Sequence, residues 1–341
     1  MTASDSYQHT ADDFKNNQEV RWCPGCGNHA ILNAVRKALA QLDIPREKFV
    51  FVSGIGCSSR FPYYMNTYGF HGIHGRAAAI ASGICIANPG LSVWQITGDG
   101  DALAIGGNHF IHVIRRNIDM NILLFNNQIY GMTKGQYSPT SGKGLVTRTS
   151  PFGTIEEPFS VGELVMGGRG SFFARATDYN ISLSTEIYVE AARHRGCSVV
   201  EVLQNCVIFN DGIHDLMTGR EVRDERTIIL RHGEAMIFGR EKDRGLMLDG
   251  FKLKVVKIGE NGISAGDILV HDAKEPDPAI HYLLAGMRYP DHPLALGVIR
   301  SVDGKTYEDE LEEQITDIRR DAEIKSVDDL LNSEPVWEAG H

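Results

Sequence analysis

The stretch from Gly98 to Asn127 constrains the fold of this chain more than any other part of the sequence. An apolar run at residues 91–97, LSVWQIT, is typical of a buried strand, and it leads into the turn Gly98-Asp99-Gly100-Asp101. A helical pattern follows, and a second buried run at residues 120–125, MNILLF, ends at Asn126-Asn127. The helical positions are Leu103, Gly107, Phe110, Ile111 and Ile114. We predict an α/β fold with a mostly parallel sheet, in which Asp99 and Asn127 emerge at the same edge.

An aspartate and an asparagine at one sheet edge suit a magnesium site. Both offer the hard oxygen atoms that Mg²⁺ prefers, and a substrate phosphate often completes its coordination. Asp99 could instead cap a helix while the asparagines form a turn. A nicotinamide-type G-x-G-x-x-G is disfavoured because Leu103 stands in the place of its third glycine. The whole spacing resembles the thiamine-diphosphate signature.

Composition narrows the classes of function. The formal charge of −10 argues against a general nucleic-acid role, because phosphate backbones need a basic surface. No apolar run is long enough to span a bilayer, and the polar N-terminal residues carry no signal-peptide core. We therefore expect a cytoplasmic protein that binds neither nucleic acid nor membrane. In such a protein, six cysteines indicate thiolate or metal chemistry more than disulfides.

Four of the six cysteines are placed to share one metal centre. Cys23 and Cys26 form a Cys-x-x-Cys motif ahead of a helix, while Cys57 and Cys206 each follow a buried strand, at residues 49–53 and 198–203. Cys197 precedes the second strand and should lie at the opposite edge. Cys85 lies inside an alanine-rich helix and is assigned to core packing. The set fits zinc or an iron–sulfur cluster.

The remaining segments suggest how the chain is divided. Residues 1–20 are expected to form a flexible arm or a partner-binding strap, and residues 21–214 the cofactor-binding domain. Within it, His74 and Arg76 beside glycines at a helix start would suit a phosphate. The segment from Gln128 to Thr140 is expected to be a long ordered loop over the ligand. Residues 215–341 change to charged, glycine-punctuated segments, and we expect a small α+β extension there.

A set of motifs carries a closer resemblance: CPGCG, GIGCSSR, HGIHGRA, GDGDALAIGGNH, NNQIYGMTKGQYSPT and a late cysteine after a buried strand. Together they resemble the β subunit of 2-oxoacid:ferredoxin oxidoreductases, over roughly the stretch from Trp22 to His214. The long tail is most like the 2-oxoglutarate type. The family implies a thiamine-diphosphate-binding fold and one [4Fe-4S] cluster held by Cys23, Cys26, Cys57 and Cys206. It also implies Mg²⁺ coordination by Asp99, Asn127 and the main-chain carbonyl of Ile129.

The same resemblance assigns further contacts. Residues expected at the cofactor are Cys57, Ser58, His74, Arg76, Gly98, Asp99, Gly100, Asp101, Asn127, Ile129, Gly131, Met132 and Thr133. Arg60 and Met132 match positions that face the 2-oxoacid side chain. A guanidinium at Arg60 could bind the distal carboxylate of 2-oxoglutarate in bidentate fashion, which favours that substrate over pyruvate.

The implied activity is oxidative decarboxylation of 2-oxoglutarate with coenzyme A to succinyl-CoA and CO₂, with electrons passing through the cluster to ferredoxin. The family further implies an α subunit in an αβ or (αβ)₂ assembly. That subunit would supply the glutamate that activates thiamine, for which no acidic residue here is identified. A pyruvate or broad-range 2-oxoacid enzyme is an alternative. Others are a non-oxidative thiamine enzyme with a structural zinc and a non-catalytic, zinc-stabilised assembly subunit.

Overall fold

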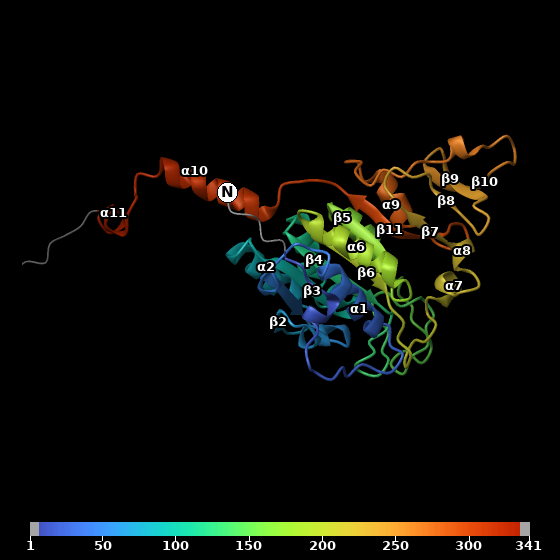
Figure 1. The fold of residues 1–341 in the computed structure, drawn as a ribbon, viewed down its shortest axis with the longest axis horizontal. Coiled ribbons are helices and arrows are strands. Elements are labelled where there is room, and N and C mark those ends of the chain that lie inside the picture. The colour runs from blue at the N-terminus through green and yellow to red at the C-terminus, as the bar shows by residue number, and fades with distance from the viewer. Residues whose placement is uncertain (1–6, 335–341) are drawn as a thin grey trace, which may run out of the picture.

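A computed structural model describes residues 7–334, and its centre is an eight-stranded sheet in the order β2-β1-β3-β4-β6-β5-β11-β7 (Figure 1). The strands of this sheet are β1 (Phe49–Ser53), β2 (Tyr68–His71), β3 (Ser92–Gly98), β4 (Met120–Asn126), β5 (Phe172–Thr177), β6 (Cys197–Leu203), β7 (Thr227–Leu230) and β11 (Leu294–Ser301). The predicted strands at residues 49–53, 91–97, 120–125 and 198–203 are therefore present with shifts of one residue at most. Their unbroken apolar runs reflect burial on both faces of a parallel sheet.

All strands from β2 to β5 in this order run parallel, and β11 is antiparallel to β5. In the centre, Gly98 at the end of β3 pairs with Phe125, and Asn126 at the end of β4 pairs with Leu203 of β6. The carboxyl ends of β1, β3, β4 and β6 thus lie side by side. The predicted α/β fold is confirmed.

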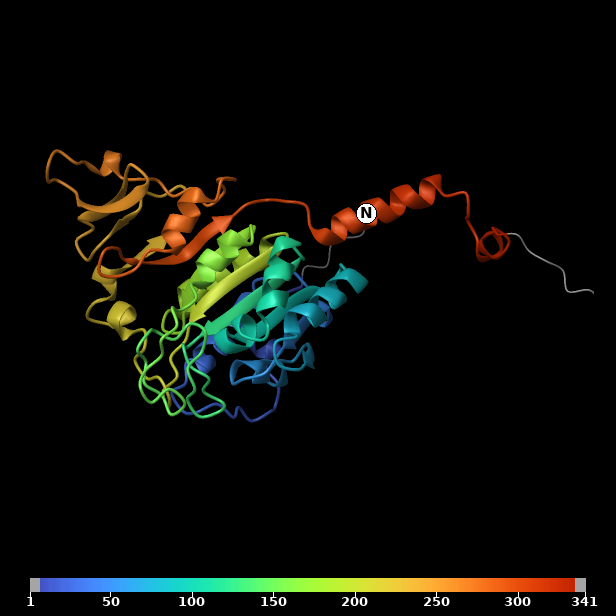
Figure 2. The same ribbon diagram turned by 180° about the vertical axis from the view of Figure 1, so that it is seen from behind.

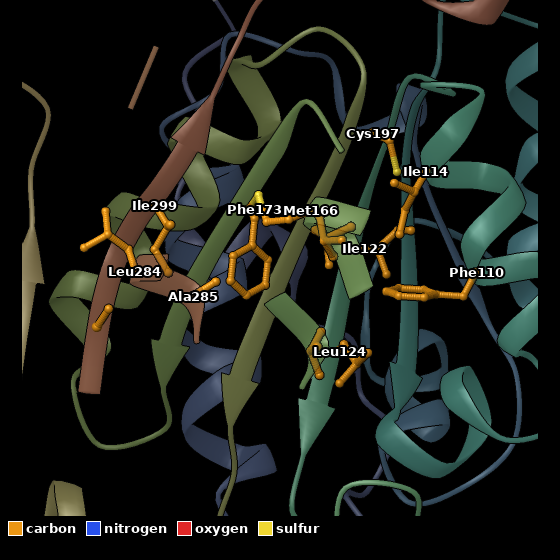
Figure 3. Packing of buried hydrophobic residues seen from close by; sticks show 14 of the residues in the cluster. Phe110, Ile114, Ile122, Leu124, Met166, Phe173, Cys197, Leu284, Ala285 and Ile299 are labelled. Carbon is orange, nitrogen blue, oxygen red and sulfur yellow. The ribbon is translucent and has the colours of Figure 1, made fainter. Parts of the chain in front are cut away.

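Two layers of helices bury the two faces of the sheet. One face is covered by α2 (Ala77–Ala87), α4 (Gly107–Arg115), α5 (Val161–Gly167) and α9 (Ala279–Ala285). The other is covered by α1 (Asn28–Leu39) and α6 (Ile181–Arg193), with the short 3-10 helices η1 (Ala11–Phe14) and η3 (Ser58–Tyr64). Side chains alternate along β4, so Ile122 and Leu124 face the first layer while Leu123 and Phe125 face the second. Figure 3 shows Phe110 and Ile114 of α4 pointing toward Ile122.

The helix predicted after the acidic turn is broken into α3 (Asp99–Leu103) and α4. The break falls at residues 104–106, where a Cβ on Gly106 would lie 2.4 Å from the carbonyl oxygen of Asp101. This tight approach leaves Ile105 exposed instead of packed on a continuous helix. The single predicted helix is therefore wrong in its continuity, although Leu103, Phe110 and Ile114 are buried as the pattern indicates.

The C-terminal third does not form a separate unit. Its strands β7 and β11 continue the main sheet, and only β8 (Ile237–Phe238), β9 (Arg244–Asp249) and β10 (Lys252–Lys257) form a sheet of their own. The predicted division at residue 214 is therefore not a break in the sheet. The sheet continues past this point because β11 pairs with β5, and the side chains on both faces of β11 are buried in the two halves of the core. The other short elements here are α7 (Asp215–Thr218), α8 (Arg223–Arg226) and η4 (Ala265–Asp267).

The two ends of the described chain behave differently. Residues 7–20 lie against the body rather than as a flexible arm, because Phe14 is fully buried and packs edge-on against Phe49; residues 1–6 lie outside the described part. At the other end, α10 (Tyr307–Asp321) and α11 (Val327–Leu331) project away from the sheet (Figures 1 and 2). Between them, residues 7–334 contain no helix long and apolar enough to cross a lipid bilayer.

Candidate functional site

Loops from four neighbouring strands meet at the carboxyl edge of the sheet. They follow β1, β3, β4 and β6, and they carry Cys57, Asp99, Asn127 and Cys206 respectively. Figure 2 shows the loops after β4, in green, gathered beyond the arrowheads of the strands. The edge therefore collects the residues that the sequence analysis assigned to the cofactors, as ligand sites of parallel sheets require.

A cavity of about 220 Å³ lies among these loops. Its walls include the predicted cofactor residues Cys57, Ser58, His74, Gly98, Asp99, Gly100, Asp101, Asn127, Ile129, Gly131, Met132 and Thr133. We call this space the thiamine cavity. Arg76 is not among its wall residues, and its guanidinium lies 3.4 Å from the carbonyl oxygens of Gly75 and Ile105. Its place at the diphosphate stays a prediction.

Two hydroxyl groups hold the carboxylate of Asp99, the predicted metal ligand. The side chains of Ser138 and Thr140 donate to its Oδ2 at 2.5 and 2.6 Å. Its Oδ1 receives no hydrogen bond from another side chain of the described residues. Burial raises the pKa of Asp99 to about 6, while the two hydroxyl hydrogen bonds oppose that rise. A divalent cation at Oδ1 would offset this burial of negative charge.

Asn127 and Ile129 lie two residues apart in one turn. Gln128 between them has a φ of 55°, in the left-handed region that few non-glycine residues adopt. The Ile129 backbone N–H donates to Asn127 Oδ1 at 3.2 Å. The Ile129 carbonyl oxygen accepts no backbone or side-chain hydrogen bond from the described residues. The strained turn therefore presents the two predicted oxygen ligands without a competing protein donor at the carbonyl.

Asp101 organises the cavity wall instead of pointing free into it. Its Oδ1 accepts from the backbone N–H groups of Gly75 and Ile55 at 2.8 and 3.1 Å, and it lies 2.6 Å from His74 Nδ1. Its Oδ2 accepts from the Thr97 hydroxyl at 2.8 Å. Both carboxylate oxygens are thus occupied, and Asp101 ties the loops after β1 and β2 to the start of α3.

Gly100 is required by a close contact with Tyr130. A Cβ at position 100 would lie 2.2 Å from the Tyr130 ring, and the Tyr130 hydroxyl donates to the Gly100 carbonyl oxygen at 3.0 Å. Burial raises the pKa of Tyr130 to about 12, with Asp99 and Asp101 adding to the rise, so this hydroxyl stays protonated at neutral pH.

The four predicted cluster cysteines line a second cavity of about 250 Å³, which we call the cysteine cavity. Cys23 is exposed, whereas Cys26, Cys57 and Cys206 are half-buried. Burial raises the pKa of Cys26 to about 12, and the other three thiols add to that rise. Metal binding would displace these protons. Cys85 and Cys197 are buried within the core beneath the first helix layer, as predicted for the two excluded cysteines.

The surroundings of the thiols bear on which metal centre they could hold. Four thiolates on one zinc at about 2.3 Å lie roughly 3.8 Å from one another. No three His, Cys, Asp or Glu side chains in residues 7–334 are arranged to hold a single ion. A Cβ on Gly131 would lie 3.3 Å from Cys206 Sγ and 4.0 Å from Cys57 Sγ, so this glycine keeps the space between them open. The four cysteines line one cavity, where they could share one zinc or each bind its own iron of a multi-iron cluster.

The two cavities share a wall that the sequence analysis did not identify. Asn28, Cys57, Asn127, Gly131, Met132 and Gln204 line both. Asn28 is only 1% exposed, and its Oδ1 has no hydrogen-bond partner among the described residues. The sequence analysis also assigned no role to four further side chains at the site. These are Ser138 and Thr140 at Asp99, Tyr130 at Gly100, and Trp22, whose indole N–H donates to the Cys57 carbonyl oxygen. Asn28 follows Cys26 by two residues and Gln204 precedes Cys206 by two, and that proximity was the available signal.

The predicted substrate contacts lie on different walls. Arg60 lines the cysteine cavity and an adjoining depression with Met132, but it does not line the thiamine cavity. Met132 borders all three spaces.

The fold and the site define a thiamine-diphosphate-binding protein of the α/β class. The model of the thiamine pyrophosphate enzymes, C-terminal TPP binding domain, matches residues 54–202. A 2-oxoglutarate oxidoreductase subunit KorB from Mycobacterium tuberculosis is 48% identical over 329 residues, which are 95% of this chain and 87% of that protein. A 2-oxoglutarate synthase subunit KorB from Methanothermobacter thermautotrophicus is 37% identical over 281 residues, or 82% of this chain and 91% of that protein. This chain belongs to the KorB family of 2-oxoglutarate oxidoreductase subunits.

A solved structure agrees with this assignment. The 2-oxoglutarate:ferredoxin oxidoreductase from Magnetococcus marinus, with 2-oxoglutarate, coenzyme A and succinyl-CoA bound, matches with a TM-score of 0.78 and 28% identity. The match covers 97% of this chain and 98% of that chain. The predicted family, fold and enzyme class are confirmed.

Proposed function

We propose that this chain is the thiamine- and cluster-carrying β subunit of a 2-oxoglutarate:ferredoxin oxidoreductase. With an α subunit and coenzyme A it converts 2-oxoglutarate to succinyl-CoA and CO₂, and electrons leave through a [4Fe-4S] cluster to ferredoxin. The observation that carries the proposal is that the thiamine and cysteine cavities adjoin and share wall residues. The names of the similar proteins support the choice of 2-oxoglutarate over pyruvate.

The thiamine cavity fits a diphosphate bridged by Mg²⁺. Asp99, Asn127 and the Ile129 carbonyl would supply three oxygen ligands, and the phosphates would complete the coordination. When bound, thiamine diphosphate supplies the carbon nucleophile and electron sink for decarboxylation, and a [4Fe-4S] cluster takes up electrons singly. Phe125, Ile129 and Met132 give the cavity an apolar wall beside its polar residues.

The acidic residues of the cavity support the need for an α subunit. Among the described residues, only Asp99 and Asp101 line it with carboxylates. Asp99 is committed to the metal, and both oxygens of Asp101 are occupied by protein donors. A glutamate that activates thiamine would therefore come from the partner, and the isolated chain would be inactive.

Metal and activity assays test the proposal. The chain is purified anaerobically with and without its α subunit, and its visible spectrum, iron, acid-labile sulfide and zinc are measured. We expect brown protein with about four irons per chain, and 2-oxoglutarate-dependent reduction of a viologen dye only in the complex. Colourless protein with one zinc would favour the zinc-stabilised alternatives. Turnover by the isolated chain would contradict the proposal that the α subunit supplies the glutamate that activates thiamine.

Arg60 is proposed to bind the distal carboxylate of 2-oxoglutarate, with Met132 beside it at the border of the cavities. Arg60→Ala should raise the KM for 2-oxoglutarate at least tenfold, roughly the value of a charge-assisted hydrogen bond. The KM for coenzyme A should stay unchanged. If the variant and the wild type had equal 2-oxoglutarate kinetics, the proposed role of Arg60 in substrate binding would be wrong.

A further inference from the structure

Gln204 occupies the boundary between the two cavities. It directly follows β6, it is only 1% exposed, and it lines both the thiamine and the cysteine cavity. Its backbone N–H donates to the Asn126 carbonyl oxygen at 3.0 Å, which continues the pairing of β6 with β4. The position of this side chain is therefore set by the sheet and not by a mobile loop.

The amide of Gln204 connects a predicted magnesium ligand with a predicted cluster ligand. Its Oε1 accepts from Asn127 Nδ2 at 2.8 Å. Its Nε2 donates to Cys26 Sγ at 3.4 Å and also to the Asn205 carbonyl oxygen. The carbonyl and the amino group of one buried amide are thus both engaged, each toward a different cavity.

The contact with Asn127 decides which atom faces the metal. Because Gln204 Oε1 is an acceptor, the Asn127 amide must turn its Nδ2 toward it. Asn127 Oδ1 is then left on the other side, beside the Ile129 backbone N–H. A side chain at position 204 that could not accept would let the Asn127 amide rotate, and its nitrogen cannot bind Mg²⁺.

The contact with Cys26 bears on the reduction potential of the cluster. Hydrogen bonds to cluster sulfurs favour the reduced form, which carries one more negative charge, and so raise the potential. The Asn28 backbone N–H also acts on the Cys26 thiol. Among the four predicted cluster ligands, Cys26 thus receives a hydrogen bond from Gln204, a residue of the wall that the two cavities share.

We propose that Gln204 is a positioning residue with two functions, orienting Asn127 toward the metal of thiamine diphosphate and raising the potential of the adjacent cluster through Cys26. This rests on the proposed function, because it requires both cofactors to bind where the two cavities lie.

Two substitutions separate these functions in the anaerobic αβ complex. Gln204→Met keeps the side-chain length but loses both contacts. Gln204→Glu keeps an acceptor for Asn127 and loses the donor to Cys26. Gln95→Met is the matched control, because Gln95 is also a buried glutamine of the same sheet but lines neither cavity. The cluster potential is measured by EPR-monitored redox titration, and the affinity for Mg²⁺–thiamine diphosphate by calorimetry after cofactor removal.

We expect Gln204→Met to lower the midpoint potential and to weaken cofactor binding by about two- to tenfold, the value of one hydrogen bond. Gln204→Glu should lower the potential and leave the affinity within twofold, and Gln95→Met should change neither. If the methionine variant assembles too little iron for a titration, the glutamate variant decides the same question. If both Gln204 variants kept the wild-type cluster potential and the wild-type cofactor affinity, the role of Gln204 would be refuted and the proposed function would stand. A wild-type complex without a four-iron EPR signal would instead overturn the proposed function.

Discussion

At the scale of single residues, the site depends on contacts that leave no room for an added atom. Gly100 lies under the Tyr130 ring, and Gly131 lies between Cys57 and Cys206. A methyl group at position 100 would collide with the ring, whereas one at position 131 would lie 3.3 Å from Cys206 Sγ and need only a small shift of that thiol. Position 100 therefore needs glycine for space more strictly than position 131.

Gly100→Ala tests this close packing. The new methyl group would push Tyr130 out of the cavity wall and disturb the adjacent Asp99, so we expect thiamine diphosphate affinity to fall more than tenfold, consistent with overpacking costs of about 1–3 kcal/mol. The affinity can be measured by calorimetry with Mg²⁺ present. Gly83→Ala is the control, because nothing lies within 4 Å of its added Cβ on α2. Equal affinities in both variants would contradict the argument.

His194, which directly follows α6, makes the stability of the folded chain depend on pH. Its Nε2 lies 2.9 Å from the Ser171 hydroxyl, which itself donates to Asn117, so the histidine acts as the donor. Burial lowers the pKa of His194 from 6.5 to about 4. The unfolded chain therefore binds a proton first as the pH falls, and the stability present above about pH 6.5 is lost progressively toward pH 4.

Denaturant unfolding at pH 7.5 and pH 5 would measure this loss. We expect His194 to account for a decrease on the order of 1–2 kcal/mol between these pH values. His194→Gln keeps a donor for Ser171 but does not titrate, so its stability should fall less over the same interval. An identical pH dependence in the variant would exclude His194 as the cause.

At the scale of elements, a buried polar network joins the C-terminal strand to the metal site. Arg175 of β5 pairs with Glu201 of β6 at 2.8 Å and donates to the carbonyl oxygen of Ala295 on β11. Glu201 also accepts from the Asn126 amide N–H, and Asn126 Oδ1 shares the single hydroxyl proton of Thr140 with Asp99. The late strand β11 is thus connected by hydrogen bonds to the predicted magnesium ligand.

Arg175→Met tests the energetic weight of this network. It leaves Glu201 buried without its cation, and breaking such a pair costs about 3–5 kcal/mol. The free energy of unfolding should fall by this amount in denaturant titrations. Arg195→Met is the matched control, because it removes an exposed pair with Asp309 and should cost less than about 1 kcal/mol. Similar costs at both sites would show that the network does not stabilise the sheet.

At the scale of the whole molecule, the C-terminal part contains two regions of different importance. The segment with β7 and β11 completes the main sheet, and Ala295, Leu296 and Ile299 of β11 are buried. Two contacts attach the first turn of α10 to the body. The Asp119 backbone N–H donates to the Glu308 carboxylate, and Asp309 forms an ion pair with Arg195. The rest of α10 extends outward (Figure 1).

Two truncations distinguish these regions. A chain that ends at residue 311 keeps the anchored turn of α10, and its Tm should stay within about 2 °C of the full chain. A chain that ends at residue 226 loses β7 to β11 and uncovers the edge of β5, so it should fail to give folded, monodisperse protein. A folded product from the shorter chain would support the sequence-based boundary at residue 214.

The sequence alone determined the parts of this protein that depend on local pattern. Buried runs predicted the central strands, and the polar residues after them predicted which loops carry Asp99, Asn127, Cys57 and Cys206, since parallel strands bring their carboxyl ends to one edge. Tertiary structure decided what depends on contacts between distant segments. Ser138 and Thr140 of a long loop reach Asp99, and Gln204 joins the two cavities. Arg76 contacts the carbonyl oxygen of Ile105, and β11 enters the sheet beside β5. No periodicity encodes such contacts, because they depend on how strands far apart in the chain are ordered in the sheet.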